Sequence, residues 1–530
     1  MKIKYILKGL ITALLLLIIV SGCDSYNEAV SDDIGASREF SPVGITARIR
    51  NRTAVELNWT VSEDTDHYVV EFAAEDPEFK SVFKTMNVNA SELPIQVALE
   101  GETVYSIRVK SVSNREKDDS KWTVVTVTTL SEQIFLPVVP GDILSKQVTL
   151  RWVPNSSVTE IVLKHSDDSK SVKHTITEQE KVNGIAIVGG LSSLTNYTAN
   201  LYNNTSRRGS RVIATGIDIT DGIEVKPSDN LNDVVANAPS NAILILQPGD
   251  YTVFTNTEIV LTKDITIRGL YNFNKPKLHV KFTVNPNVLS ASLIDLDLEA
   301  ATLNNPSVLT ISNAAGSFGD ILIKGCTIHD FTRSLIAGGN TNGNIVNSVT
   351  IDDCVVTNVN TNVGADFIDF RNTFVKNILI KNSTFNNCSA SRDFVRADAG
   401  SLSGGSYTTN VAIENCTLNN VSNIAVVSPT AGKRILYLRF LSNTSTVKNT
   451  LITNTTALYS NQSATVPPAF SKNYYFNAAG FKDAAITLNK IDASGTVADP
   501  QYVNAASGDF TVKNQTLIDN NIGDPRWIQE

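Results

Sequence analysis

Four segments of nearly the same sequence decide the fold: ILIKGCTIHDF from Ile321, VTIDDCVVTNV from Val349, ILIKNSTFNNC from Ile378 and VAIENCTLNNV from Val411. Each opens with apolar residues two positions apart, the period of a strand with one buried face. A small residue and then a short polar residue follow at fixed positions. The small residues are Cys326, Cys354, Ser383 and Cys416, and the polar residues are Asp330, Asn358, Asn387 and Asn420.

The same apolar pair recurs upstream, at Ile265 with Ile267 and at Ile294 with Leu296, so repeats start at 265, 294, 321, 349, 378 and 411. A nearly constant period with one strand pattern per repeat indicates a solenoid. The sequence has neither the paired helical patterns of ankyrin and tetratricopeptide repeats nor a fixed leucine scaffold. We therefore predict a right-handed parallel β-helix with rungs about 4.8 Å apart. Its small residues would fill one inward column, and its Asn amides would hydrogen-bond along another.

The amino-terminal region predicts export. Lys2, Lys4 and Lys8 precede an apolar run over 11–20, and Val20-Ser21-Gly22-Cys23 follows directly. This pattern predicts a signal peptide over 1–22. Val-Ser-Gly-Cys resembles the bacterial lipobox, which implies lipidation of Cys23, a polar tether over 23–41 and a lipoprotein at the outer membrane facing the cell exterior.

Composition limits the partners and the chemistry. The 530 residues carry a formal charge of −8 without a Lys/Arg run, which argues against a nucleic-acid partner. The five histidines are scattered, and no zinc spacing, phosphate loop or Ser/His/Asp arrangement is present. The four cysteines other than Cys23 lie within the repeats, and their even number admits disulfides. Three of them share one core column, which favours buried thiols.

Two longer repeats precede the solenoid, over 42–130 and 131–220. Trp59 is followed by Tyr105 in the first, and Trp152 is followed by Tyr197 at nearly the same distance in the second. A buried Trp on an early strand and a Tyr at a strand corner resemble the fibronectin type III sandwich. The resemblance implies two such domains that space the solenoid away from the membrane.

The solenoid is expected to span 221–530. A helix is predicted over 227–240 because Leu231, Val234, Val235 and Ala238 follow helical spacing, with Ser228 as N-cap. A strand and Pro248-Gly249-Asp250-Tyr251 come next, and this order resembles the start of pectin-lyase-like β-helices. The helix would cover the open apolar end, and residues 499–527 would form a second cap.

Taken whole, the chain resembles uncharacterised lipoproteins that glycan-degrading Gram-negative bacteria encode beside polysaccharide lyases and transporters. The resemblance implies a role in glycan utilisation. We expect a monomer that holds an acidic, plant-type polysaccharide along the β-helix. The alternatives are a lyase that cleaves a uronate-containing glycan and a purely structural or adhesive protein.

Two consecutive rungs carry the candidate site. Superposing Phe367 on Phe394 aligns three charged pairs, and Arg333 comes from the preceding rung. The aligned pairs are Asp366 with Asp393, Asp369 with Arg396, and Arg371 with Asp398.

Three interpretations of these residues are open. In a lyase, Asp366 and Asp393 would hold Ca²⁺ and Arg392 or Arg396 would be the base. In a structural ladder, the second and third aligned pairs would form ion pairs across rungs. In a binding surface, the glycan contacts would come from Arg333, Asp369, Arg371 and Asp398. No cofactor is expected apart from calcium in the lyase case.

A second candidate is the aromatic segment 470–481. Tyr474 and Tyr475 could stack on sugar faces, or they could pack a long loop onto the solenoid.

Overall fold

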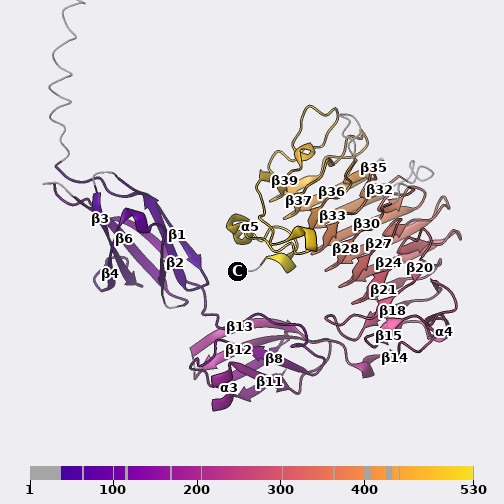
Figure 1. Ribbon diagram of the computed structural model, residues 1–530, viewed down its shortest axis with the longest axis horizontal. Helices are drawn as coiled ribbons and strands as arrows, with labels where there is room; N and C mark the ends of the chain where they lie inside the picture. Colours follow the sequence, from indigo (N-terminus) through magenta and orange to yellow (C-terminus); the bar gives the residue numbers. More distant parts are fainter. Residues whose placement is uncertain are drawn as a thin grey trace, which may run out of the picture.

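The computed structural model describes residues 37–528, apart from 63–64, 100, 114–116, 168–169, 205, 301–302, 362–363, 399–406, 425–432 and 441. The proposed leader, Cys23 and most of the tether lie outside the described residues. The rest consists of strands with a few short helices, arranged as two small domains and a region of long parallel sheets (Figure 1).

The first domain is a sandwich of two antiparallel sheets. Trp59 and Tyr68 meet edge to face in its core at 5.2 Å between ring centroids, and Tyr105 is also buried there. One sheet contains β1 (Val43–Arg50), β2 (Ala54–Thr60) and β5 (Ile95–Ala98). The other contains β3 (Thr65–Ala74), β4 (Val82–Val88), β6 (Val104–Ser113) and β7 (Thr123–Thr128).

The second domain repeats this design. Trp152 is fully buried, and the Tyr197 hydroxyl accepts a hydrogen bond from the Ser192 N–H at 2.9 Å, a tyrosine corner. A helix that the sequence analysis missed, α3 (Glu178–Asn183), starts at a capping box between Thr177 and Glu180. The sheets contain β8 (Gln147–Arg151) with β11 (Ile185–Gly189), and β9 (Glu160–His165), β10 (Ser171–Thr175), β12 (Asn196–Asn203) and β13 (Ser206–Ala214). Both domains have the expected fibronectin type III fold.

From residue 223 onward the chain enters three parallel sheets in turn, one strand at a time. The first sheet contains β14 (Ile223–Val225), β15 (Ala242–Leu246), β18 (Ile265–Gly269), β21 (Ser290–Ile294), β24 (Ser317–Lys324), β27 (Ile345–Asp352), β30 (Phe374–Lys381), β33 (Thr408–Glu414), β36 (Ser442–Lys448) and β38 (Ala469–Ser471). The second contains β16 (Asp250–Tyr251), β19 (Lys277–Leu278), β22 (Asp297–Glu299), β25 (Thr327–His329), β28 (Val355–Thr357), β31 (Thr384–Asn386), β34 (Thr417–Asn419), β37 (Leu451–Thr453), β39 (Tyr474–Phe476) and β40 (Thr496–Val497). The third contains β17 (Glu258–Leu261), β20 (Lys281–Val284), β23 (Leu309–Ile311), β26 (Ile336–Ala337), β29 (Ile368–Phe370), β32 (Val395–Ala397) and β35 (Leu436–Leu438).

The register confirms the repeats except at one position. Ile265 lies beside Ala291, and Ala291 lies beside Ile321, so that repeat starts at 291 and not at 294. Leu296 instead stands in the small-residue column, because its carbonyl accepts the Thr327 N–H as the Cys326 carbonyl accepts the Val355 N–H. The segment Ile294-Asp295-Leu296 turns a corner, and apolar residues on both sides of a corner imitate strand alternation.

The predicted Asn column is present, at the corner between the second and third sheets. Asn420 donates to Asn387 at 2.8 Å, Asn387 to Asn358 at 3.4 Å, and Asn358 to Asp330 at 3.2 Å. All four residues have positive φ between 52° and 62°, a conformation that Asn and Asp tolerate better than other side chains.

A second Asn ladder, not predicted, runs along the corner between the first and second sheets. Asn449 donates to Asn415 at 3.1 Å and Asn415 to Asn382 at 3.2 Å, again with positive φ. The core column beside it holds Cys326, Cys354 and Cys416. These cysteines and Cys388 are buried free thiols, which confirms that prediction.

The ends of the three-sheet region are covered. Helix α4 (Leu231–Asn237) buries Leu231 and Val235 at one end; it is shorter than predicted, and its N-cap is Asn230 and not Ser228. At the other end the buried Tyr459 and Tyr475 hydroxyls are 2.9 Å apart, and Tyr475 donates to Asp492 at 2.8 Å.

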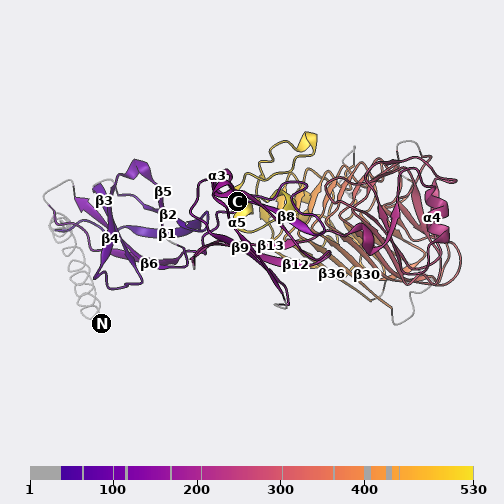
Figure 2. The same ribbon diagram turned by 90° about the horizontal axis from the view of Figure 1, so that it is seen from below.

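The tail then folds back over the sheets. It contains α5 (Gln515–Asp519) and a 3₁₀ turn (Pro525–Trp527). The Thr384 hydroxyl donates to Asp524 and accepts a hydrogen bond from the Trp527 indole, both at 2.7 Å. Arg50 of the first domain forms an ion pair with Asp519 at 2.9 Å. The first domain therefore contacts the end of the chain, and the second domain lies beside the first rungs (Figures 1 and 2).

Candidate functional site

The candidate residues lie on the outer face of the third sheet, where three columns cross three rungs. Asp369 pairs with Arg396, and Arg396 with Tyr437, in the parallel register. The Phe367 and Phe394 rings stack beneath the sheet at 4.7 Å, which fixes the flanking columns. The columns are Asp366, Asp393, Arg434; Asp369, Arg396, Tyr437; and Arg371, Asp398, Arg439. We call these nine residues, together with Arg333 and Arg392, the arginine–aspartate surface.

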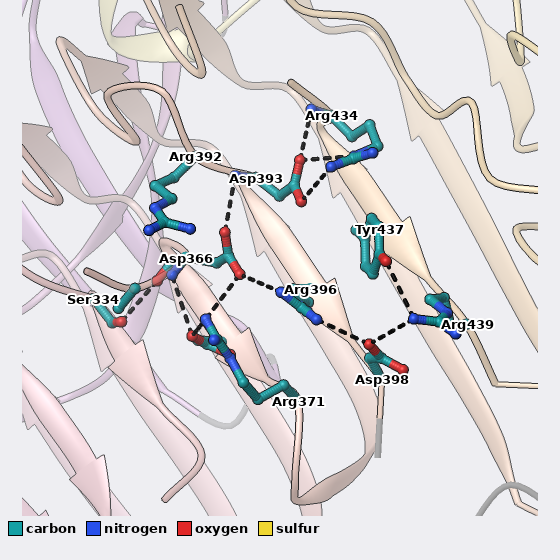
Figure 3. Close-up of polar contacts among 12 residues, drawn as sticks. Ser334, Asp366, Arg371, Arg392, Asp393, Arg396, Asp398, Arg434, Tyr437 and Arg439 are labelled. Carbon is teal, nitrogen blue, oxygen red and sulfur yellow. Dashed lines mark hydrogen bonds and ion pairs between the residues drawn. The ribbon is translucent and has the colours of Figure 1, made fainter. Parts of the chain in front are cut away.

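The alignment predicted from the sequence is confirmed, but the predicted ion pairs are wrong. Arg371 bonds Asp369 within its own rung at 2.8 Å and reaches Asp366 at 3.1 Å. Arg396 bonds Asp398 in its own rung at 3.0 Å and Asp366 in the preceding rung at 3.2 Å (Figure 3). An arginine side chain is long enough to reach diagonal neighbours, so residues aligned across rungs do not have to pair.

The third rung of the surface was missed. Arg434 binds both oxygens of Asp393, at 2.9 and 3.1 Å, while Arg439 lies 3.4 Å from Asp398. The Tyr437 ring lies between guanidinium groups, 4.8 Å from that of Arg396 and 4.5 Å from that of Arg434. The alternation in Arg434-Ile-Leu-Tyr-Leu-Arg439 matches Asp366-Phe-Ile-Asp-Phe-Arg371 and could have identified this rung.

Asp366 organises the surface. It is 2% exposed, accepts the Asp393 N–H at 3.1 Å and receives both Arg371 and Arg396. Burial, with the nearby charges of Asp369 and Asp393, raises the pKa of the Asp366 carboxyl. Burial lowers the pKa of Arg396, but its bonds to Asp398 and Asp366 outweigh this effect and the net shift is upward. Arg371 and Arg396 are thus held in place as cations.

The surface carries more cations than it neutralises internally. It has six arginines and four aspartates, although the whole chain has a formal charge of −8. Among the described residues none accepts a hydrogen bond from the Arg392 side chain, and its buried Nε has no partner (Figure 3). In the part of the chain that the structure describes, the Arg333 side chain has only a 3.5 Å hydrogen bond to the Gly364 carbonyl. Arg333 and Arg371 also line a neighbouring groove of about 370 Å³ whose floor includes Gly338 and Gly339.

These residues do not fit a calcium site. The carboxylates of Asp366 and Asp393, the proposed ligands, are already occupied by guanidinium groups. Within the described parts of the chain, no three His, Cys, Asp or Glu side chains are placed to hold a metal ion. The raised pKa of Arg396 also opposes its use as a base, which requires a pKa near the working pH.

The aromatic pair at the far end does not form a sugar platform. Tyr474 is 9% exposed and packs with Leu451 and Val512, and Tyr475 is 1% exposed inside the end cap. Both positions are therefore corrected from candidate glycan contacts to buried residues, because β39 turns the Tyr475 ring into the core and the tail covers the Tyr474 ring on the other face.

Comparisons with known proteins bear on parts of the chain. Residues 249–388 match a family described as a domain of unknown function (DUF4957), and residues 411–527 match another domain of unknown function (DUF5123). No curated protein matches the chain.

Solved structures match the amino-terminal third. A two-domain fibronectin type III segment from chicken tenascin is 16% identical, with a TM-score of 0.22, covering 33% of this chain and 99% of that chain. The FN1–FN3 domains of chicken CNTN1 are 17% identical, with a TM-score of 0.15, covering 33% of this chain and 66% of that chain. Within the described ranges, the structure contains no helix long and apolar enough to cross a membrane.

Proposed function

We propose that the three parallel sheets form a right-handed, pectin-lyase-like β-helix that binds an acidic polysaccharide without cleaving it. The arginine–aspartate surface is the binding site. A lipid on Cys23 would hold the chain at the outer membrane, with the two fibronectin type III domains as spacers, in the glycan-utilisation role that the sequence resemblance implies.

One observation carries this proposal: on three successive rungs, half-buried arginines are held in place by buried aspartates. Neighbouring parallel strands lie about 4.8 Å apart, so the cations of the three rungs lie close together, although Arg371, Arg396 and Arg434 occupy different columns. Guanidinium groups are suited to planar carboxylates and bind them by charge-assisted hydrogen bonds. Because the ion pairs fix their side chains before the ligand arrives, binding has less conformational entropy to overcome.

The same contacts support binding without cleavage. Arg396 is committed to two carboxylates, and Asp366 and Asp393 are committed to arginines. Both proposed metal ligands and one candidate base, Arg396, are therefore engaged with one another or with neighbouring ion-pair partners, while Arg392, the other candidate base, is not.

The test uses the chain from residue 24 onward and a panel of soluble polysaccharides that includes polygalacturonate and neutral glucans. Retention and absorbance at the unsaturated-uronide band are followed together, with and without Ca²⁺. We expect retention of the acidic polymers alone, weakened by salt, without new absorbance. The double variant Arg333→Ala/Arg439→Ala should lose retention.

Two results would contradict the proposal. Absorbance that rises with wild type but not with Arg392→Ala would show that the chain is a lyase. If neutral and acidic polymers are retained equally, and the double variant does not change this, the arginine–aspartate surface is not the binding site.

A further inference from the structure

One corner of the three-sheet region breaks the repeat. In the seven corners from β21 to β39, two residues connect the first sheet to the second. Between β18 and β19 the corner has seven residues, 270–276. Insertions into a solenoid repeat are commonly found on its binding face. The arginine–aspartate surface lies on the third sheet. This insertion lies instead at the corner between the first and second sheets, on a different face.

The inserted loop presents two aromatic rings to the second domain. Tyr271 and Phe273 stack with ring centroids 5.1 Å apart, and Phe273 lies beside Gly141. Phe273 nevertheless remains 39% exposed, so packing against the second domain leaves part of its ring accessible. Both rings line a cleft of about 400 Å³ between the second domain and the first rungs, a location and size typical of ligand sites.

The lining of the cleft also contains charged groups, and one of them is a half-exposed cation. Lys324 lines the cleft, its side chain is 51% exposed, and its nearest carboxylate oxygen, on Asp352, is 4.0 Å away. The other charged groups of the cleft are already engaged: Arg268 with Asp295 at 3.2 Å, and Asp353 with Arg526. A ligand with one apolar face and one negative charge would therefore complement the rings and Lys324.

We propose that this cleft binds a uronic acid residue, with its C–H face on the Tyr271–Phe273 pair and its carboxylate at Lys324. A uronic acid combines both features in one ring, and the cleft has room for a short oligosaccharide. The choice of ligand rests on the proposed function, but the residues are separate. The chain would then have two subsites: the arginine–aspartate surface for polymer and this cleft for a short acidic segment.

The experiment titrates trigalacturonate, and separately its methyl ester, into the chain from residue 24 onward by calorimetry. Phe273→Leu keeps the apolar volume but removes the aromatic face, and Lys324→Ala removes the cation. Phe83→Ala, an exposed phenylalanine of the first domain, is the matched control. Unfolding temperatures equal to wild type establish that each variant is folded.

We expect trigalacturonate binding that falls about tenfold or more in Phe273→Leu and in Lys324→Ala. It should be unchanged in Phe83→Ala, and the methyl ester should bind weakly. Three results would each show that the cleft does not bind a uronic acid: wild-type affinity in both cleft variants, equal affinity for the ester, or no trisaccharide binding. Polymer retention that still depends on Arg333 and Arg439 would leave the proposed function intact in each of these cases. If those arginines do not matter but Phe273 does, the proposed function fails and the cleft stands.

Discussion

The two sides of the three-sheet region follow different rules. At the corner between the first and second sheets, short turns repeat with little change, and Asn382, Asn415 and Asn449 donate along one line. On the outer face of the third sheet, the residue type changes along every column; the first, for example, runs from Asp366 and Asp393 to Arg434. Where stacking alone selects the residue, the sequence repeats. On the third sheet the residues vary but still form one connected network, which supports the ligand site that we propose.

We call the outer face of the third sheet the variable side, and the corner between the first and second sheets the regular side. The largest effect is expected at the centre of the variable side. Asp366→Ala would leave Arg371 and Arg396 without a shared buried partner, and we expect a loss of about 2–4 kcal/mol in the free energy of unfolding. Urea denaturation measures it. Asp66→Ala, an exposed carboxylate of the first domain, is the control and should change stability by less than about 0.5 kcal/mol. A loss as small as the control's would mean that the network is not held by Asp366.

On the regular side, Asn415→Ala should cost about 1–2 kcal/mol, because it removes two ladder hydrogen bonds and places alanine at φ 52°. Asn415→Gly keeps the conformation and loses only the bonds, so it should cost less. The difference between the two unfolding free energies separates backbone strain from the ladder bonds. If alanine and glycine cost the same, strain plays no part there.

The second sheet also contains a group that titrates. The pKa of His329 is raised to about 9 by its bond to Asp297, against the opposing effect of burial and with help from Asp330. The folded-state pKa lies above the ordinary value, so this contribution is complete below about pH 6.5 and is lost as pH rises through 9. Wild type should lose on the order of 1 kcal/mol more than His329→Gln between pH 6.5 and 10. Parallel stability profiles for the two proteins would contradict this assignment.

The smallest effect on stability should accompany the clearest effect on binding. Arg439 is 50% exposed and lies 3.4 Å from Asp398, so Arg439→Ala should change the unfolding free energy by less than about 0.5 kcal/mol. Retention of polygalacturonate should nevertheless weaken several-fold and become less sensitive to salt. Arg48→Ala, in the first domain, serves as the charge-matched control. If Arg439→Ala and Arg48→Ala retain the polymer equally, the variable side does not take part in ligand binding.

The sequence was sufficient where one residue type repeats at one position. The period, the Asp330 column, the buried thiols and the alignment of Asp369 with Arg396 all follow from strand alternation. Ion-pair partners did not follow, because an arginine can reach along its own rung or diagonally as easily as straight across. The Arg434 rung was missed because a longer insertion separates it from Asp393 than separates Asp393 from Asp366. The misplaced repeat at Ile294 has a different cause: an apolar residue on each side of a corner reads as a strand.

The ion pair between Arg50 and Asp519 has a mechanical consequence. A pull on the amino-terminal domain would reach the sheets by two routes in parallel: along the covalent chain through the second domain, and across this contact into α5. A partly exposed ion pair contributes at most about 1 kcal/mol and is screened by salt. The contact between Arg50 and Asp519 would therefore break first, and it would re-form once the load is removed. The protein would then respond as a stiff body to small forces and as an extended string of domains to larger ones.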